Sequence, residues 1–247
     1  MAAASSGEAI KDTAAKWIPV ESSRLSRLLY ANPVCLLSVY DPKTGSKNVM
    51  AITWLSCINN KGGFICSVNT RRHTAHFLRQ PGTFFVLNVP VQGMEKLIIS
   101  IGSCSGALVD KFEALDIKAC APGFQPQSFL SEVADVHHTI IKQKSNSKKS
   151  QQGLKIQEAL QSTKAIESTV AHCICEVKSV HEDDGHLILR CTQLAAWCRE
   201  EYWNGHQFFP RSLQGQAMPR SFLTFMGSKV FGYVAQSENI QNIQSKD

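Results

Sequence analysis

The chain lacks the apolar segments that would direct it to a membrane. In its 247 residues, no run approaches the roughly 20 consecutive apolar residues that a membrane-spanning helix needs. The segment from Met1 to Lys16 contains no apolar block and includes Glu8 and Asp12, so neither a secretory signal nor an arginine-rich transit peptide fits it. These absences predict a cytoplasmic protein that makes no membrane contact.

The cysteines lack the pattern of a disulfide framework. There are nine of them, an odd number, and most lie inside apolar segments typical of strands. His172, Cys173 and Cys175, with Cys191 and Cys198 further on, are residue types that bind zinc, but they form no Cys-x-x-Cys knuckle. The sequence therefore favours reduced, buried thiols over a zinc site, and we expect no bound metal.

Several common catalytic motifs are also absent. The chain contains no Gly-x-Ser-x-Gly nucleophile elbow, no His-Glu-x-x-His zinc motif and no Gly-x-Gly-x-x-Gly dinucleotide fingerprint. The sequence therefore gives no support to a serine hydrolase, a zinc protease or a Rossmann-type dehydrogenase.

The positive charge is confined to one segment. The formal net charge is +6, and the segment from Lys142 to Lys164 holds six lysines against one acid, Glu158. This segment has no aromatic residue, whereas single-stranded nucleic-acid binders combine basic residues with aromatic ones. We interpret it as a solvated insertion and do not expect a nucleic-acid partner. A weak contact with an anionic surface or with nucleic acid is the alternative, and a basic interaction protein would depend on this segment alone.

Short β-rich segments separated by turn residues dominate the rest of the chain. Asp184-Gly185 is a strong two-residue hairpin signal between two of these segments. Many short antiparallel strands with a few helices at one side predict a mainly β fold with α additions, a small barrel. The expected strands span residues 34–40, 46–55, 54–58, 64–68, 84–89, 170–180 and 186–195, and the expected helices span 22–30, 73–79, 93–103, 109–115 and 154–167.

The same pattern predicts a single domain. We expect this domain to span residues 21–235, with the basic, polar insertion at about 122–165. Residues 1–20 are expected to be mobile, and residues 236–247 to form a polar tail.

Two neighbouring segments are typical of a phosphate site. Asn48 to Trp54 is predicted to be a strand that runs into a turn with hydroxyl residues, and Ser67 to Thr74 a strand that ends at a helix start. Arg71 and Arg72 lie at this helix start, where the dipole disfavours cations, so an anionic ligand would resolve the conflict. A structural ion pair is the alternative explanation for Arg72.

The order of several motifs resembles that of the flavin reductase-like proteins, whose fold is the FMN-binding split barrel. The resemblance covers residues of about 33–112 and 165–235. Its elements are Asn-Pro-Val before the first strand, Asn48 to Trp54, Arg72-His73-Thr74, Gly82 to Val89, Ser105-Gly106 ahead of Asp110-Lys111-Phe112, and Gly185-His186, which matches the family's Gly-Asp-His element with the order altered. The resemblance implies an antiparallel, Greek-key-like split barrel that forms a homodimer.

The resemblance also implies which residues contact the flavin ring and which contact its phosphate. Residues along the flavin ring would be Asn48, Thr53, Trp54 and Leu55, with Ser67 and Asn69 on the next strand and Asn88 facing the same cleft. Residues at the flavin phosphate would be Arg72 and Thr74, with Arg71 and His73 beside them, while Lys111 and Phe112 would be peripheral or reach the neighbouring subunit.

The implied cofactor is FMN, with FAD possible, and the implied hydride donor is NAD(P)H. The implied activity is that of an NAD(P)H-dependent flavin reductase, in which hydride passes from the nicotinamide to flavin N5. His186 is the side chain that we expect to contact the nicotinamide. The alternative is a non-catalytic FMN-binding or electron-transfer module that works with a protein partner.

Three of these residues also have ordinary structural explanations. Asn48 could simply begin its strand, Trp54 could be a core aromatic, and His186 could be a polar residue after a hairpin turn.

Overall fold

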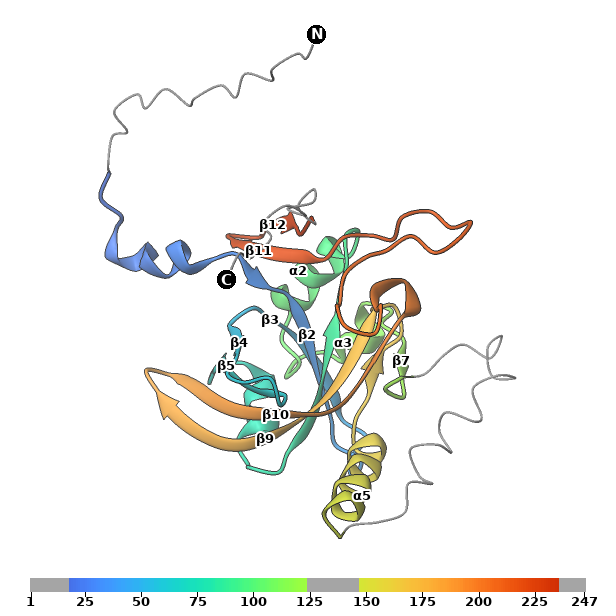
Figure 1. Ribbon diagram of the computed structural model, residues 1–247. Helices are drawn as coiled ribbons and strands as arrows, with labels where there is room; N and C mark the ends of the chain where they lie inside the picture. Colours follow the sequence, from blue (N-terminus) through green and yellow to red (C-terminus); the bar gives the residue numbers. More distant parts are fainter. Residues whose placement is uncertain (1–17, 124–146, 236–247) are drawn as a thin grey trace, which may run out of the picture.

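A curled antiparallel sheet forms the centre of the protein. The computed structural model describes residues 18–123 and 147–235. Seven strands pair in the order β3-β2-β6-β9-β10-β5-β4, and the sheet bends into a barrel (Figure 1). Their bounds are β2 (Cys35–Tyr40), β3 (Lys47–Ile52), β4 (Leu55–Cys57), β5 (Gly63–Asn69), β6 (Phe84–Val89), β9 (Ala171–Asp183) and β10 (His186–Cys198).

The barrel is open between its two edge strands. β3 and β4 lie at opposite ends of the strand order, although only Thr53 and Trp54 separate them in the sequence. The two strands diverge at this point, and β4 pairs with β5 instead, with Leu55 opposite Cys66. The expected mainly β split-barrel fold is therefore confirmed.

The long hairpin β9–β10 has the turn that its sequence predicts. Asp184 and Gly185 both have positive φ, 44° and 70°, as a tight two-residue turn requires. The strands extend beyond the expected bounds, to 13 residues each. His186 is therefore the first residue of β10, opposite Asp183 on β9 and Asn69 on β5.

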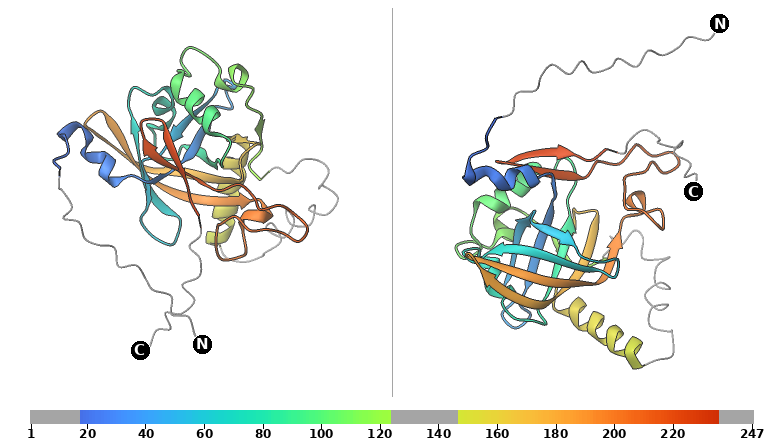
Figure 2. Two further views of the ribbon diagram at one scale, coloured as in Figure 1. Left: turned by 90° about the horizontal axis from the view of Figure 1, so that it is seen from above. Right: turned by 60° about the vertical axis from the view of Figure 1, so that its left-hand side comes forward.

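A second, three-stranded sheet lies beside the barrel. It consists of β1 (Asn32–Pro33), β11 (Leu223–Gly227) and β12 (Val230–Tyr233), and the last two strands lie beyond those expected from the sequence. The 3₁₀ helix η1 (Ser22–Leu29) runs next to this sheet, where the Tyr30 and Phe225 rings lie 5.6 Å apart (Figure 2).

Helices and a short sheet complete the described residues. Under the three-stranded sheet lies α2 (Glu95–Ser103), which is followed by α3 (Lys111–Ala114), whereas α1 (His73–Leu78) follows β5 directly (Figure 1). The remaining elements are the 3₁₀ helix η3 (Glu200–Tyr202), the helix α5 (Ser147–Gln161) and the pair β7 (Ala119–Cys120) and β8 (Ala165–Ile166).

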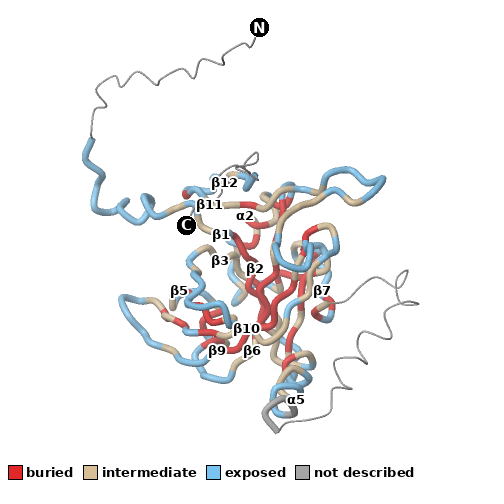
Figure 3. The backbone as a smooth tube through the Cα atoms, in the orientation of Figure 1, coloured by how far each residue is buried: buried red, intermediate tan, exposed pale blue. Residues whose placement is uncertain are grey.

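Buried side chains form two main cores. One fills the barrel between β2, β5, β6, β9 and β10 and contains Phe85, the largest fully buried side chain. The other packs α2 and α3 against the outside of β2 and β3, and buried backbone gathers along β2 in Figure 3. All residues of η1 are exposed, so this helix adds nothing to either core.

The helix at the end of the basic segment is shifted toward the N-terminus relative to the expectation. It was expected over residues 154–167, but it spans Ser147–Gln161, and residues 165–166 pair as a strand instead. Lys155 forms an ion pair with Glu176 at 2.6 Å, and Lys164 lies over the Tyr40 ring. Lys142 and Lys144 lie outside the described residues. No helix in the described ranges is long and apolar enough to cross a membrane.

Candidate functional site

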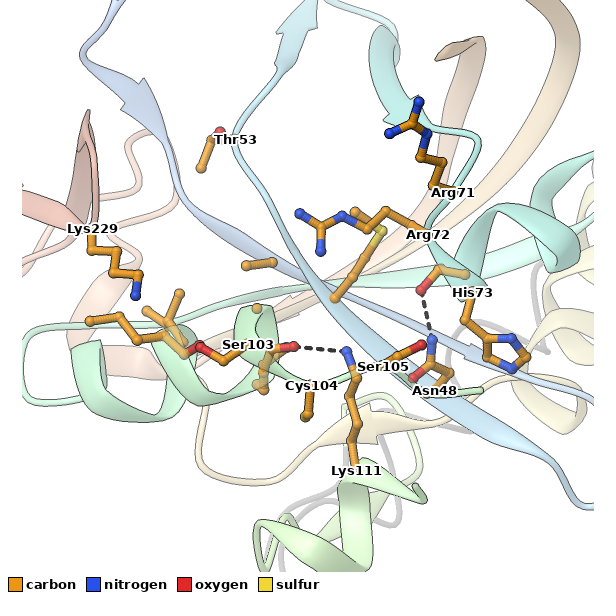
Figure 4. Close-up of a pocket in the computed structure, with 18 of the residues that line it drawn as sticks. Asn48, Thr53, Arg71, Arg72, His73, Ser103, Cys104, Ser105, Lys111 and Lys229 are labelled. Carbon is orange, nitrogen blue, oxygen red and sulfur yellow. Dashed lines mark hydrogen bonds between the residues drawn. The ribbon is translucent and has the colours of Figure 1, made fainter. Parts of the chain in front are cut away.

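A cavity of about 450 Å³ opens between β3, the β5–α1 turn, the end of α2 and the β11–β12 hairpin (Figure 4). Six of the residues expected at a ligand line it, namely Asn48, Thr53, Arg71, Arg72, His73 and Thr74. These residues come from β3, the β3–β4 link, the β5–α1 turn and the start of α1, and they share one cavity.

The cavity carries positive charge without a matching carboxylate. Arg71, Arg72, Lys111 and Lys229 line it, and none of its lining residues, all within the described ranges, is an aspartate or glutamate. Cations that share a small space repel one another unless an anion lies between them. The lining is therefore suited to an anionic ligand.

The β5–α1 turn fixes the two arginines through Asn69. The side-chain Oδ1 of Asn69 accepts the Arg71 backbone N–H at 2.9 Å, and its backbone carbonyl accepts the Arg72 N–H at 3.0 Å. In Figure 4 the Arg72 guanidinium extends across the cavity, whereas the Arg71 guanidinium points away from the other labelled side chains. Because α1 has only six residues, its dipole is a weak source of affinity and the side chains must supply most of it.

A buried hydrogen bond sets the direction of the Thr74 hydroxyl. Asn48 Nδ2 donates to Thr74 Oγ1 at 2.8 Å, and both residues are almost completely buried. A hydroxyl that accepts in this way keeps its own proton for another acceptor. Asn48 Oδ1 is buried and has no hydrogen-bond partner among the described residues. Such an orphaned acceptor is costly, and a ligand donor would satisfy it.

Gly106 makes room for Asn48. A Cβ atom at residue 106 would lie 2.2 Å from Asn48 Oδ1, so no larger residue fits without moving the amide. A free hydroxyl proton, an unpaired carbonyl oxygen and several cations together fit a ligand with a phosphate and a hydroxyl-bearing chain, as FMN has. Ser105-Gly106 was part of the family resemblance, but no ligand contact was expected there.

Lys111 lies at the floor of the cavity and was expected to be peripheral. Its residue is 5% exposed, and its Nζ donates to the carbonyls of Val49 at 3.0 Å and Ile101 at 2.7 Å. Burial lowers the pKa of this lysine below its usual 10.5, the positive charge of Arg72 lowers it further, and Cys104 opposes the shift. Its buried position follows from α3, which Asp110 caps by accepting the Phe112 N–H.

His73 lies beside the same cations. Burial, the neighbouring His76 and Lys111 together lower the pKa of His73. Its ring packs edge-on against Phe77, with centroids 5.6 Å apart. The neutral form of His73 is therefore favoured next to Arg72 and Lys111.

A second group of expected residues lies outside the cavity lining, on β5, β10 and the β3–β4 link. The Trp54 and His186 rings lie 5.6 Å apart, and Asn69 Nδ2 is 3.4 Å from His186 Nε2. Nδ1 of His186 lies 3.0 Å from the Asp184 carbonyl, which can only accept, so Nδ1 carries the proton. We call Trp54, Asn69 and His186 the rim cluster, and Asn48, Arg72, Thr74 and Lys111 the anion cluster.

Leu55 and Ser67 lie next to Trp54 of the rim cluster. Leu55 packs partly against the barrel core, and the Ser67 N–H donates to the Trp54 carbonyl at 2.9 Å. Neither residue lines the cavity. Trp54 is 42% exposed, so it is not the core aromatic that was its structural alternative.

The expectation that Asn88 faces the cleft is corrected. Asn88 is 0% exposed and does not line the cavity. Its Nδ2 donates to the Leu36 carbonyl at 2.8 Å and to Ser38 Oγ at 2.9 Å, while its Oδ1 accepts the Ile166 N–H at 2.8 Å. These bonds join β2, β6 and β8, so Asn88 is a structural residue. An asparagine in an apolar strand does not reveal from sequence which face it occupies.

The sequence also missed the contribution of the C-terminal hairpin. Phe225, Lys229 and Phe231, from β11, its turn and β12, line one side of the cavity. No strand was expected here, because the run from residue 223 to 233 contains two glycines and no clear alternation.

The cysteines lie mainly in the barrel core. Cys173 and Cys175 are buried, with their sulfur atoms 3.8 Å apart. Within residues 18–123 and 147–235, no three His, Cys, Asp or Glu side chains are placed to hold a metal ion.

The open antiparallel barrel is the split-barrel fold that the family resemblance implied. No family model matches the sequence, and no curated protein matches it either. Solved structures do match in fold. Flavoredoxin from Methanosarcina acetivorans is 19% identical with a TM-score of 0.62, and the alignment covers 94% of this chain and 98% of that one.

Two further structures extend the comparison. A candidate flavin reductase with a split barrel domain from Shewanella frigidimarina is 10% identical, with a TM-score of 0.59 and coverage of 90% of this chain and 93% of that one. The NADH:FAD oxidoreductase of Streptomyces globisporus is 14% identical, with a TM-score of 0.56 and coverage of 91% and 99%. At these identities the likeness establishes the fold, and function requires a separate argument.

Proposed function

We propose that this protein binds FMN in the cavity and acts as an NAD(P)H-dependent flavin reductase. The observation that carries the proposal is the anion cluster, in which cations, a hydroxyl proton and an orphaned amide oxygen meet without a carboxylate. Similar folds support it, since one bears the name flavoredoxin and another is an NADH:FAD oxidoreductase that also has a structure with NAD and FAD fragments.

Each residue has a role that follows from its position in the cavity. Arg72 and Thr74 bind the phosphate, with Arg71 and His73 beside them, and Asn48 Oδ1 accepts a hydroxyl of the sugar-like chain. Thr53 lines the cavity and directly precedes Trp54 of the rim cluster, so the flavin ring extends in that direction. When bound, FMN supplies the hydride acceptor, its N5 atom.

The rim cluster forms the side from which the nicotinamide approaches. His186 with its protonated Nδ1 bound to Asp184 presents Nε2, and Trp54 supplies an exposed apolar face. Both are held at the open edge of the barrel, so they limit where a second ring can stack and which side of the flavin it meets.

A homodimer is part of the proposal. Leu25, Leu28 and Leu29 of η1 are 54%, 66% and 80% exposed, and Val230 on the neighbouring β12 is 55% exposed. A second copy of the chain that covers this apolar surface would also enclose the cavity side formed by the β11–β12 hairpin. Sedimentation analysis of the wild type and of Leu28→Asp tests this, with a dimer expected for the first and a monomer for the second.

The alternative is a non-catalytic FMN-binding or electron-transfer module. It is favoured by the partly exposed His186, whose only described polar neighbours are Asn69 and Asp184. FAD in place of FMN is a variant of the same proposal.

One pair of measurements tests the proposal. Purified protein should show bound flavin absorbance or bind added FMN, and should then consume NADH or NADPH. Binding of FMN without consumption of either nicotinamide would favour the electron-transfer module. Absence of FMN and FAD binding would contradict the proposed function altogether.

A further inference from the structure

Cys104 is the cysteine that lines the cavity. It directly follows Ser103, the last residue of α2, and its backbone is extended, with φ −111° and ψ 154°. Its Sγ donates to the Ser100 carbonyl at 3.3 Å, one of the carbonyls that lack an intrahelical partner at a helix end. A thiol is only a weak donor, so this bond leaves the sulfur able to react. Cys104 is therefore a partly exposed thiol in the wall of the proposed flavin site.

The other cysteines give a comparison within the same chain. Burial raises the pKa of Cys35 to about 12, and burial likewise raises that of Cys198 to about 12. A thiol must lose its proton before it attacks a disulfide, so these two react slowly near neutral pH. Cys57 is exposed on β4 and does not line the cavity. It therefore serves as a reference thiol that solutes reach without entering the cavity.

Positive charge surrounds Cys104. Figure 4 shows it beside Lys111, and Arg72 and Lys229 line the same cavity, whose lining contains no aspartate or glutamate. Burial lowers the pKa of Lys111, and Cys104 lies close enough to oppose this shift. Fixed cations attract anions and raise the rate at which they arrive. A negatively charged reagent should therefore reach Cys104 faster than a positively charged one.

Asn48 adds a second recognition group to the same cavity. It is 2% exposed, and its Oδ1 has no hydrogen-bond partner among the described residues. A buried acceptor of this kind is satisfied by an N–H donor of a ligand. A peptide that carries carboxylates offers both the N–H donors and the negative charge. The cavity volume of about 450 Å³ is near the lower end for ligand pockets, so a peptide attached to Cys104 and a flavin compete for it.

We propose that Cys104 undergoes reversible disulfide exchange with an anionic peptide disulfide, and that the peptide then attached to Cys104 blocks flavin binding. The Cys104 thiol first loses its proton to water, and its sulfur attacks one sulfur of the disulfide. A bond forms between these two sulfurs, the original S–S bond breaks, and the other half of the disulfide leaves as a thiolate that takes a proton from water. A small thiol reverses the exchange. The blocking of flavin rests on the proposed function, whereas the modification of Cys104 does not.

Labelling of the wild-type protein tests the modification site. Oxidised glutathione, an anionic peptide disulfide, and cystamine, a cationic disulfide, are added in parallel at low ionic strength, and mass spectrometry of peptides gives the rate at each cysteine. The ratio of the glutathione rate to the cystamine rate should be at least about 10-fold higher at Cys104 than at Cys57, because the cations of the cavity act only at the first. Taking this ratio removes the intrinsic difference between the two reagents. Equal ratios at the two cysteines would overturn the proposal.

Flavin binding tests the consequence of the modification. After treatment with oxidised glutathione, the wild type should bind FMN at least about 10-fold more weakly, and dithiothreitol should restore the affinity. Cys104→Ser, which keeps a hydroxyl donor for the Ser100 carbonyl, should show the same FMN affinity before and after treatment, whereas the control Cys57→Ser should respond as the wild type does.

The wild-type measurements decide the proposal even if Cys104→Ser does not fold. Unchanged FMN affinity of the wild type with Cys104 modified would overturn it. No FMN binding by the untreated wild type would instead reject the proposed function, and the labelling ratio would still decide the modification site.

Discussion

The fold holds three of the four residues of the anion cluster more firmly than it holds the rim cluster, whereas Arg72, the fourth, is exposed. Asn48, Thr74 and Lys111 are buried and bonded to one another or to the backbone of β3 and α2. Trp54 and His186 are partly exposed, and the described contacts of the His186 ring are one aromatic neighbour and two polar neighbours. Groups that are fixed before binding lose little entropy on binding. The first cluster is therefore suited to hold a ligand, and the second to admit a partner that leaves again.

Replacing Arg72 with alanine should lower FMN affinity more than any substitution in the rim cluster does. We expect Arg72→Ala to weaken FMN binding by about 1.5 to 3 kcal/mol, the value of a charged hydrogen bond, with little effect on riboflavin. Titration calorimetry with both ligands measures this. Arg71→Ala is the matched control, because the Arg71 guanidinium points away from the other labelled side chains in Figure 4 and its loss should cost less. Equal losses for FMN and riboflavin would contradict the assignment of Arg72.

A larger residue at position 106 should displace the Asn48 amide and so disturb the anion cluster. In Gly106→Ala the new methyl group would lie 2.2 Å from Asn48 Oδ1, so the amide must move. Overpacking of this kind costs about 1 to 3 kcal/mol, and we expect lower thermal stability together with weaker FMN binding.

Gly102 provides the control for this substitution. It lines the same cavity, but a Cβ atom there meets nothing within 4 Å. Gly102→Ala should leave the melting temperature unchanged or raise it, because alanine favours the helix. If both variants behaved alike, the close approach of Gly106 to Asn48 would not be what shapes the site.

The smallest effect on flavin affinity is expected at the rim cluster. His186→Ala should change FMN affinity by less than about 0.5 kcal/mol, as for a substitution away from the main contacts. The KM for NADH or NADPH should rise severalfold in steady-state assays, with the dissociation constant for FMN unchanged. Loss of FMN binding in this variant would instead show that His186 belongs to the flavin site. The two clusters would then not differ in their roles.

The sequence predicted the barrel well because its signals are local. Alternating apolar residues and the Asp184-Gly185 turn identify strands and hairpins, and β6 was expected with the bounds that the structure shows. The convergence of Asn48 with Arg72 and Thr74 was implied by the family resemblance, and in the structure Asn48 Nδ2 donates to Thr74 Oγ1 at 2.8 Å.

The missed residues depend on contacts that are distant in sequence. Lys111 reaches the cavity only because α3 packs below β3, and Lys229 does so through a hairpin more than 100 residues later. Asn88 shows the reverse case, since the strand was expected but the face on which its amide would lie was not determined by periodicity. Tertiary packing decides all three positions.

Comparison of FMN and riboflavin binding by the wild-type protein tests the central claim most directly. If Arg72 and Thr74 form a phosphate site, FMN should bind at least about 100-fold more tightly than riboflavin, because more than one charged hydrogen bond depends on the phosphate. Fluorescence titration of the two flavins under identical conditions provides the ratio. Affinities equal within about threefold, which corresponds to less than one ordinary hydrogen bond, would contradict the phosphate site.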